Sequence, residues 1–137
     1  MRTRFPELVV MAAALVAGIS FSHAASTPGY TAEQAQRGER LYSDNCASCH
    51  GDKLDNGDGD GAPALVGVAF TQQWGGKSVG EFFSYTATNM PANAPASLSP
   101  ASYADIVAYI LGKNGAAAGS DVLPSDSARL NAMVMPR

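Results

Sequence analysis

The stretch Cys46-Ala47-Ser48-Cys49-His50 decides how this chain folds. It contains both cysteines of the sequence and one of its two histidines. On a helical turn, residues three and four positions apart share a face, so Cys46 and Cys49 can both reach the vinyl edge of one porphyrin. His50 then projects its imidazole toward the iron. C-x-x-C-H is the attachment signature of a c-type haem, and the sequence therefore predicts one covalent haem here.

Two other interpretations use the same cysteines. A thioredoxin-like redox pair also has the C-x-x-C spacing, but it expects a βαβ context, and no strand–helix alternation follows this stretch. A structural zinc site usually has four Cys or His ligands, and only three are present here. Both interpretations are therefore weaker than haem attachment.

Four segments in order along the chain resemble the class I, mono-haem c-type cytochromes. The resemblance extends from about residue 31 to residue 115, and it implies an all-α cytochrome c fold in which the N- and C-terminal helices cross around one covalent haem. The first segment is specific, whereas the others are weak alone and gain weight from their order. The segments are Cys46-Ala47-Ser48-Cys49-His50-Gly51, Ala62-Pro63-Ala64-Leu65, Asn89-Met90-Pro91 and Asp105-Ile106-Val107-Ala108-Tyr109-Ile110.

The resemblance implies roles in haem binding for two residues outside the motif. The carbonyl of Pro63 would accept the Nδ1–H of His50, which orients the ring as an axial ligand. Trp74 is the only tryptophan, and its indole N–H would bind a haem propionate. An ordinary core position explains Trp74 equally well.

Met90 is predicted to be the second axial ligand. His23 lies in a segment expected to be cleaved, which leaves His50 as the only histidine. Met90 lies between two predicted helices, and Pro91 restricts it to extended backbone geometry. Class I cytochromes place their ligand in such a Met-Pro setting. A methionine of the C-terminal tail, or an open or lysine-bound iron, stays as an alternative.

The first 24 residues have the pattern of a secretory signal peptide. Two arginines precede an apolar run of 14 residues, and Ser22-His23-Ala24 offers a cleavage site. An uncleaved anchor is the weaker interpretation, because a membrane-spanning helix needs about 20 residues. The sequence predicts a single periplasmic domain over 25–137, with no membrane span after cleavage and with 114–137 as a C-terminal tail that either wraps the body or is disordered.

The charge of the cleaved chain limits its partners. Removing residues 1–24 takes away two of the 9 basic and one of the 12 acidic residues, leaving 7 against 11 and a formal net charge of −4. This balance argues against nucleic acid or an anionic membrane as a partner. Redox proteins are the predicted partners, and the chain is expected to be a monomer that forms transient complexes with them. Its acidic charge would steer the encounter with a basic patch on the partner.

Capping signals predict three helices. Thr31 and Gln34 form the pattern of a capping box, and the helix should run to about residue 45. Ser78 and Glu81 form a second such pair, for a helix ending near residue 88. Ser99 and Pro100 open a third helix, which Gly112 or Gly115 can end.

Apolar spacing predicts which side chains of these segments face inward. Gly38 lies where the family has a glycine that lets the last helix cross closely, with Ile106 and Tyr109 opposite. The expected inward-facing residues are Ala35, Gly38, Leu41, Tyr42, Leu65, Val66, Val68, Phe70, Phe82, Phe83, Tyr85, Tyr103, Ile106, Val107, Ile110 and Leu111.

The loop 52–61 is rich in Asp, Asn and Gly. It matches the first half of an EF-hand calcium loop, but Gly67 stands where the bidentate glutamate belongs. We therefore expect a solvated turn here rather than a calcium site, and the sequence alone does not decide the matter.

Histidine and thioether together favour ferrous iron, and with both axial positions filled a substrate has no free coordination site. This predicts one-electron transfer rather than catalysis. The resemblance, in the segment 74–109 and around Leu123-Pro124, is to cytochromes serving periplasmic quinoprotein dehydrogenases. It implies a dehydrogenase as donor and a terminal oxidase or another cytochrome as acceptor. The alternatives are a haem subunit of a larger oxidoreductase, and an open-site haem enzyme or gas sensor.

Overall fold

The structure is a computed structural model that describes residues 29–56 and 61–137. The predicted signal peptide and the centre of the loop 52–61 lie outside the described residues. Within these residues the chain is all-α, as the sequence predicts. Their β-type pairing is limited to an isolated antiparallel bridge between Ser78 and Val134. The helices are α1 (Ala32–Asn45), α2 (Ala47–His50), α3 (Gly67–Trp74), α4 (Val79–Asn89), α5 (Pro100–Lys113) and α6 (Ser127–Asn131).

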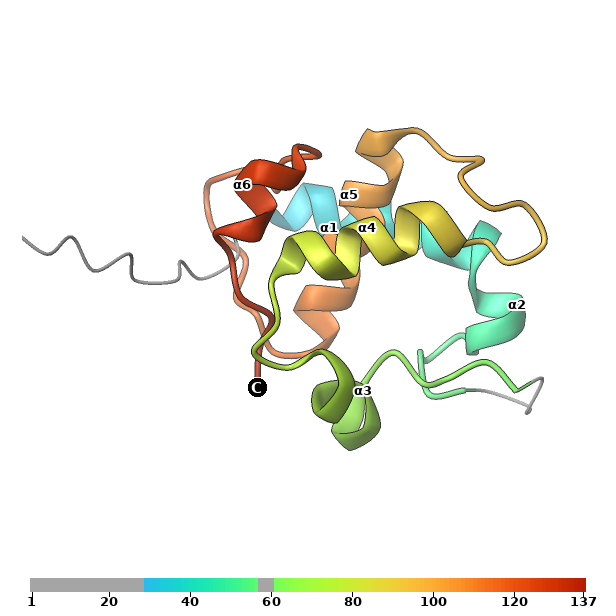
Figure 1. Cartoon of the computed structure of the whole chain (residues 1–137). Coiled ribbons are helices and arrows are strands. Elements are labelled where there is room, and N and C mark those ends of the chain that lie inside the picture. Colours follow the sequence, from blue (N-terminus) through green and yellow to red (C-terminus); the bar gives the residue numbers. More distant parts are fainter. Residues whose placement is uncertain (1–28, 57–60) are drawn as a thin grey trace, which may run out of the picture.

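Helices α1 and α5 pack against one another, and α4 lies beside α5 (Figure 1). A Cβ atom added at Gly38 would overlap the carbonyl oxygen of Asp105 and lie 2.9 Å from Cβ of Tyr109. The Tyr42 and Tyr109 rings are 5.4 Å apart next to this point. The absence of a side chain at Gly38 therefore lets the two helices approach closely, as predicted from the resemblance.

The predicted capping box at the start of α1 is half wrong. The Thr31 hydroxyl accepts the Gln34 N–H at 3.2 Å, as expected of an N-cap. The Gln34 side chain, however, is only 1% exposed and does not return to Thr31. It donates to the Leu123 carbonyl at 3.0 Å and accepts the Leu123 N–H at 2.7 Å. The Gln34 side chain, expected to complete the local capping box, instead pairs with a residue 89 positions away.

The other two capping predictions are confirmed. Ser78 and Glu81 form a complete capping box at α4, and the Ser99 hydroxyl accepts the Ser102 N–H at α5. Helix α5 ends at Lys113 with Asn114 as its C-cap, and Gly115 follows with a φ of +91°. Helix α3 was not predicted, because its eight residues carry neither a cap side chain nor a clear apolar period.

The C-terminal tail wraps the body, which decides between the two possibilities left by the sequence. Leu123, Leu130 and Met135 are each at most 1% exposed. The Met135 N–H donates to the Lys77 carbonyl at 2.9 Å, and the Val79 N–H donates to the Met133 carbonyl at 2.9 Å. These bonds join residues 133–135 to the start of α4, and α6 packs against α4 (Figure 1).

Across the described ranges, none of the helices has the length and apolar character that a membrane span requires.

Candidate haem-binding site

One cavity of about 440 Å³ lies between α2, α3, α4 and α5. Such a volume is in the range of small-molecule and cofactor sites. The described residues that line it include no Asp, Glu, Lys or Arg. All six site residues predicted from the sequence are among them: Cys46, Cys49, His50, Pro63, Trp74 and Met90.

His50 lies at the end of α2 and is 7% exposed. Its Nδ1 is 2.8 Å from the carbonyl oxygen of Pro63. A carbonyl can only accept, so Nδ1 carries the proton and a neutral ring keeps its lone pair on Nε2. This is the hydrogen bond that the family resemblance implied, and it leaves Nε2 available as a ligand atom.

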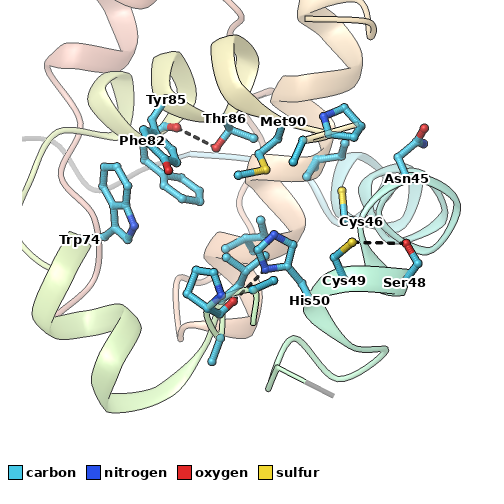
Figure 2. A pocket seen from close by; sticks show the side chains of 18 of the residues that line it. Asn45, Cys46, Ser48, Cys49, His50, Trp74, Phe82, Tyr85, Thr86 and Met90 are labelled. Atoms are coloured by element: carbon cyan, nitrogen blue, oxygen red, sulfur yellow. Dashed lines mark hydrogen bonds between the residues drawn. The ribbon is translucent and has the colours of Figure 1, made fainter. Parts of the chain in front are cut away.

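Met90 lies across the cavity from His50. Figure 2 shows the thioether and the imidazole pointing toward one another from opposite walls. Met90 is the C-cap of α4, and its backbone is extended (φ −119°, ψ 152°), as expected before a proline. Of the methionines in the described residues, Met133 and Met135 do not line the cavity, and Met135 is only 1% exposed in the core.

The two cysteines lie on one side of the cavity (Figure 2). The chain turns helically from α1 into α2, because the Cys46 N–H donates to Tyr42 O at 2.8 Å and the His50 N–H donates to Cys46 O at 2.9 Å. Burial, with a smaller contribution from Cys49, raises the pKa of the Cys46 thiol to about 11. Redox-active C-x-x-C pairs have a lowered thiol pKa. The surroundings of Cys46 therefore do not favour the thioredoxin-like interpretation.

Trp74 forms the wall opposite the cysteines (Figure 2). It is 9% exposed, and its ring centroid lies 5.0 Å from that of Phe82 and 5.4 Å from that of Tyr85. The Lys77 ammonium lies 5.0 Å from the same indole ring. Trp74 is thus a core residue that also lines the cavity, and its bond to a propionate stays a prediction.

Two side chains expected to face inward are exposed. Val68 is 75% exposed, because Phe70 and Trp74, four residues apart on α3, form the buried face of that helix. Tyr85 is 47% exposed, although it lines the cavity beside Trp74. The expectation that Val68 faces inward was therefore wrong, whereas Tyr85 faces the cavity as expected.

Several residues that shape the cavity were missed from the sequence. Ile106 and Ile110 of α5 line it, and so does Thr86, whose hydroxyl donates to Phe82 O at 2.8 Å. The Tyr103 hydroxyl donates to the Met90 carbonyl at 2.6 Å. The Asn114 amide donates to Leu65 O at 2.8 Å and ties the segment after Pro63 to the end of α5. The apolar period identifies these α5 positions only as inward-facing.

The donor set fits a c-type haem. Two thiols lie on one wall, an imidazole whose Nδ1 is bound to Pro63 O lies on the floor and a thioether lies above it, in a largely apolar cavity. An all-α domain that combines this donor set with C-x-x-C-H on a helical turn defines a c-type cytochrome. Residues 33–110 match the family described as cytochrome c oxidase, cbb3-type, subunit III, and the chain belongs to this family. The family indicates an electron-transfer role with covalent haem c.

A solved structure has the same fold. The crystal structure of the sulfane dehydrogenase SoxCD from Paracoccus pantotrophus contains a chain that is 23% identical, with a TM-score of 0.51. The match covers 95% of this chain and 69% of that chain. At this level of identity the likeness shows the fold alone. No curated protein matches the chain.

Proposed function

We propose that the protein is a periplasmic electron carrier with one covalent haem. The observation that carries the proposal is the placement of His50 and Met90 on opposite walls of one cavity (Figure 2). In this proposal Cys46 and Cys49 would hold the haem by thioether bonds, and His50 and Met90 would supply the two ligands of its iron. A bound haem supplies a one-electron change at its iron.

The protein residues orient the cofactor and exclude water. The bond from Nδ1 to Pro63 fixes the tautomer of His50 and the plane of its ring. The thioether of Met90 would hold the iron of a bound haem, favour its reduced form and keep small molecules from it. Trp74 closes the far wall, and its indole N–H is the proposed donor to a propionate. Filled axial positions support electron transfer rather than catalysis.

Redox proteins are the proposed partners, and nucleic acid is not. The donor would be a dehydrogenase, with quinoprotein dehydrogenases as candidates, and the acceptor a terminal oxidase or another cytochrome. The described residues around the cavity are uncharged by residue type, so the net acidic charge would guide the approach and short-range contacts would complete the docking. The chain would act as a monomer in transient complexes.

A second candidate function is that of a haem subunit fixed in a larger oxidoreductase. It is favoured by the structural likeness to a chain of SoxCD, which is named as a sulfane dehydrogenase. Stable co-purification with a dehydrogenase through size-exclusion chromatography would support the subunit, whereas elution of the native cytochrome alone would support the free carrier.

The ligand assignment is tested by one substitution made at two methionines. Met90→Leu should abolish the ferric sulfur-to-iron charge-transfer band in the red, lower the potential and allow the ferrous protein to bind carbon monoxide. Met135→Leu removes a thioether from the core with little change in volume, so it should leave all three properties unchanged. Retention of the band in Met90→Leu would show that Met90 is not the ligand.

A further inference from the structure

Three tyrosine hydroxyls in the described residues donate to main-chain carbonyls at the same short distance of 2.6 Å. Tyr30 donates to Ala116, Tyr42 to Gly51 directly after His50, and Tyr103 to Met90. The Tyr103 side chain is 3% exposed on α5. One of the three bonds thus ends on the residue proposed as the second axial ligand.

Tyr103 also contacts the far end of the segment that carries Met90. Residues 90–98 leave α4 and return to the start of α5, and we call this segment the methionine strap. The Leu98 N–H donates to the Tyr103 hydroxyl at 3.4 Å, while the hydroxyl donates to Met90 O. Within the strap, Ala94 N–H donates to Pro91 O at 2.9 Å, which is a local turn. Both ends of the strap therefore meet at one phenol.

The middle of the strap makes few packing contacts that would hold the strap in place. Residues 92–97 are exposed, and they are alanine, asparagine, proline and serine. Such side chains bury little apolar surface. The direction of the Met90 side chain then depends on how its backbone is fixed, and Tyr103 contributes a part-buried hydrogen bond to that backbone at the carbonyl.

We propose that Tyr103 is the positioning residue for Met90: it joins both ends of the methionine strap to α5 and keeps the thioether directed into the cavity. This inference rests on the proposed ligation by Met90. Without the hydroxyl, the Met90 carbonyl loses a partner and the strap can move away from the cavity. The equilibrium between methionine and an added ligand should then shift by about tenfold, the typical worth of one buried hydrogen bond.

The test is Tyr103→Phe, with Tyr30→Phe as the matched control. Both variants keep the ring and lose a 2.6 Å bond to a carbonyl, but the Tyr30 bond ends on Ala116 whereas the Tyr103 bond ends on Met90. Imidazole displaces the thioether from ferric haem, and its binding is followed by loss of the charge-transfer band. We expect Tyr103→Phe to bind imidazole about tenfold more tightly than the unchanged protein and Tyr30→Phe to bind it as the unchanged protein does. Equal affinities in the two variants would overturn the proposal.

A double-mutant cycle shows whether Tyr103 acts through Met90. In a Met90→Leu background, the Tyr103→Phe change should leave imidazole affinity unaltered. The same tenfold gain in that background would overturn the positioning role. The charge-transfer band of the unchanged protein distinguishes failure of the proposed Met90 ligation from failure of the proposed Tyr103 role. Its absence would refute ligation by Met90, whereas its presence together with identical tyrosine variants would refute only the role of Tyr103.

Discussion

Gln34→Met should detach the C-terminal tail from α1. The substitution keeps the length and approximate volume of the side chain but removes its donor and its acceptor. In the structure both are used on Leu123, at 3.0 Å and 2.7 Å, and both residues are 1% exposed. The Leu123 N–H and carbonyl would be left buried without their partner.

The expected loss follows from these two groups. Each buried polar group that loses its partner costs about 1–3 kcal/mol. Some relaxation toward water lowers the sum, and we expect about 2–4 kcal/mol for the pair. For a domain of roughly this size, 1 kcal/mol corresponds to about 4–8 °C, so the midpoint should fall by about 8–32 °C. If the tail opens as a separate unit, the loss appears as local opening instead.

Denaturant and thermal unfolding measure the global loss, and hydrogen exchange at the Leu123 amide measures local opening. Gln36→Met is the matched control, because Gln36 is an exposed glutamine on the same helix. It should change stability by no more than about 0.5 kcal/mol. Equal melting temperatures and equal Leu123 exchange in the two variants would refute the reasoning.

Two further predictions follow from the helix crossing and from the N-terminal segment. Gly38→Leu should destabilise the fold by at least about 1–3 kcal/mol, because even its Cβ would overlap the Asp105 carbonyl. The control Gln36→Leu lies on the exposed face and should not destabilise the fold. Similar urea midpoints in the two variants would remove the role of Gly38 at the crossing. Intact-mass measurement of exported protein should give a chain starting at about residue 25 with one haem added; a chain that retains residues 1–24, or lacks the haem mass, would contradict the corresponding proposal.

Helix starts were predictable because they depend on neighbours in the sequence. Thr31, Ser78 and Ser99 each accept an N–H three residues later. The exception is Gln34, whose sequence pattern is that of a capping box. Its amide was satisfied instead by Leu123, because burial of the tail backbone required a partner there. A local rule failed where a long-range contact offered two hydrogen bonds.

The inward-facing side chains were predicted less evenly. The apolar face of α5 is buried, because one long helix with a regular period leaves little choice of orientation. Val68 lies in a segment too short for such a period, and its exposure depends on which side of α3 meets the core. Tyr85 lines a cavity open enough to leave its ring half exposed, which hydrophobicity alone cannot indicate.

The two walls of the cavity depend on different kinds of sequence information. On the histidine side, the helical turn and the bond to Pro63 join residues at most 17 apart (63 − 46), so the motif predicts the turn and the family resemblance implies the bond. On the methionine side, Met90 ends α4 but is fixed from α5 by Tyr103. The apolar period marks Tyr103 only as an inward-facing residue, and nothing local shows where its hydroxyl donates. The motif itself predicts the turn that carries the cysteines and His50, whereas the roles of Pro63 and Met90 required a family resemblance. The residue proposed to position the methionine emerges only from the packed structure.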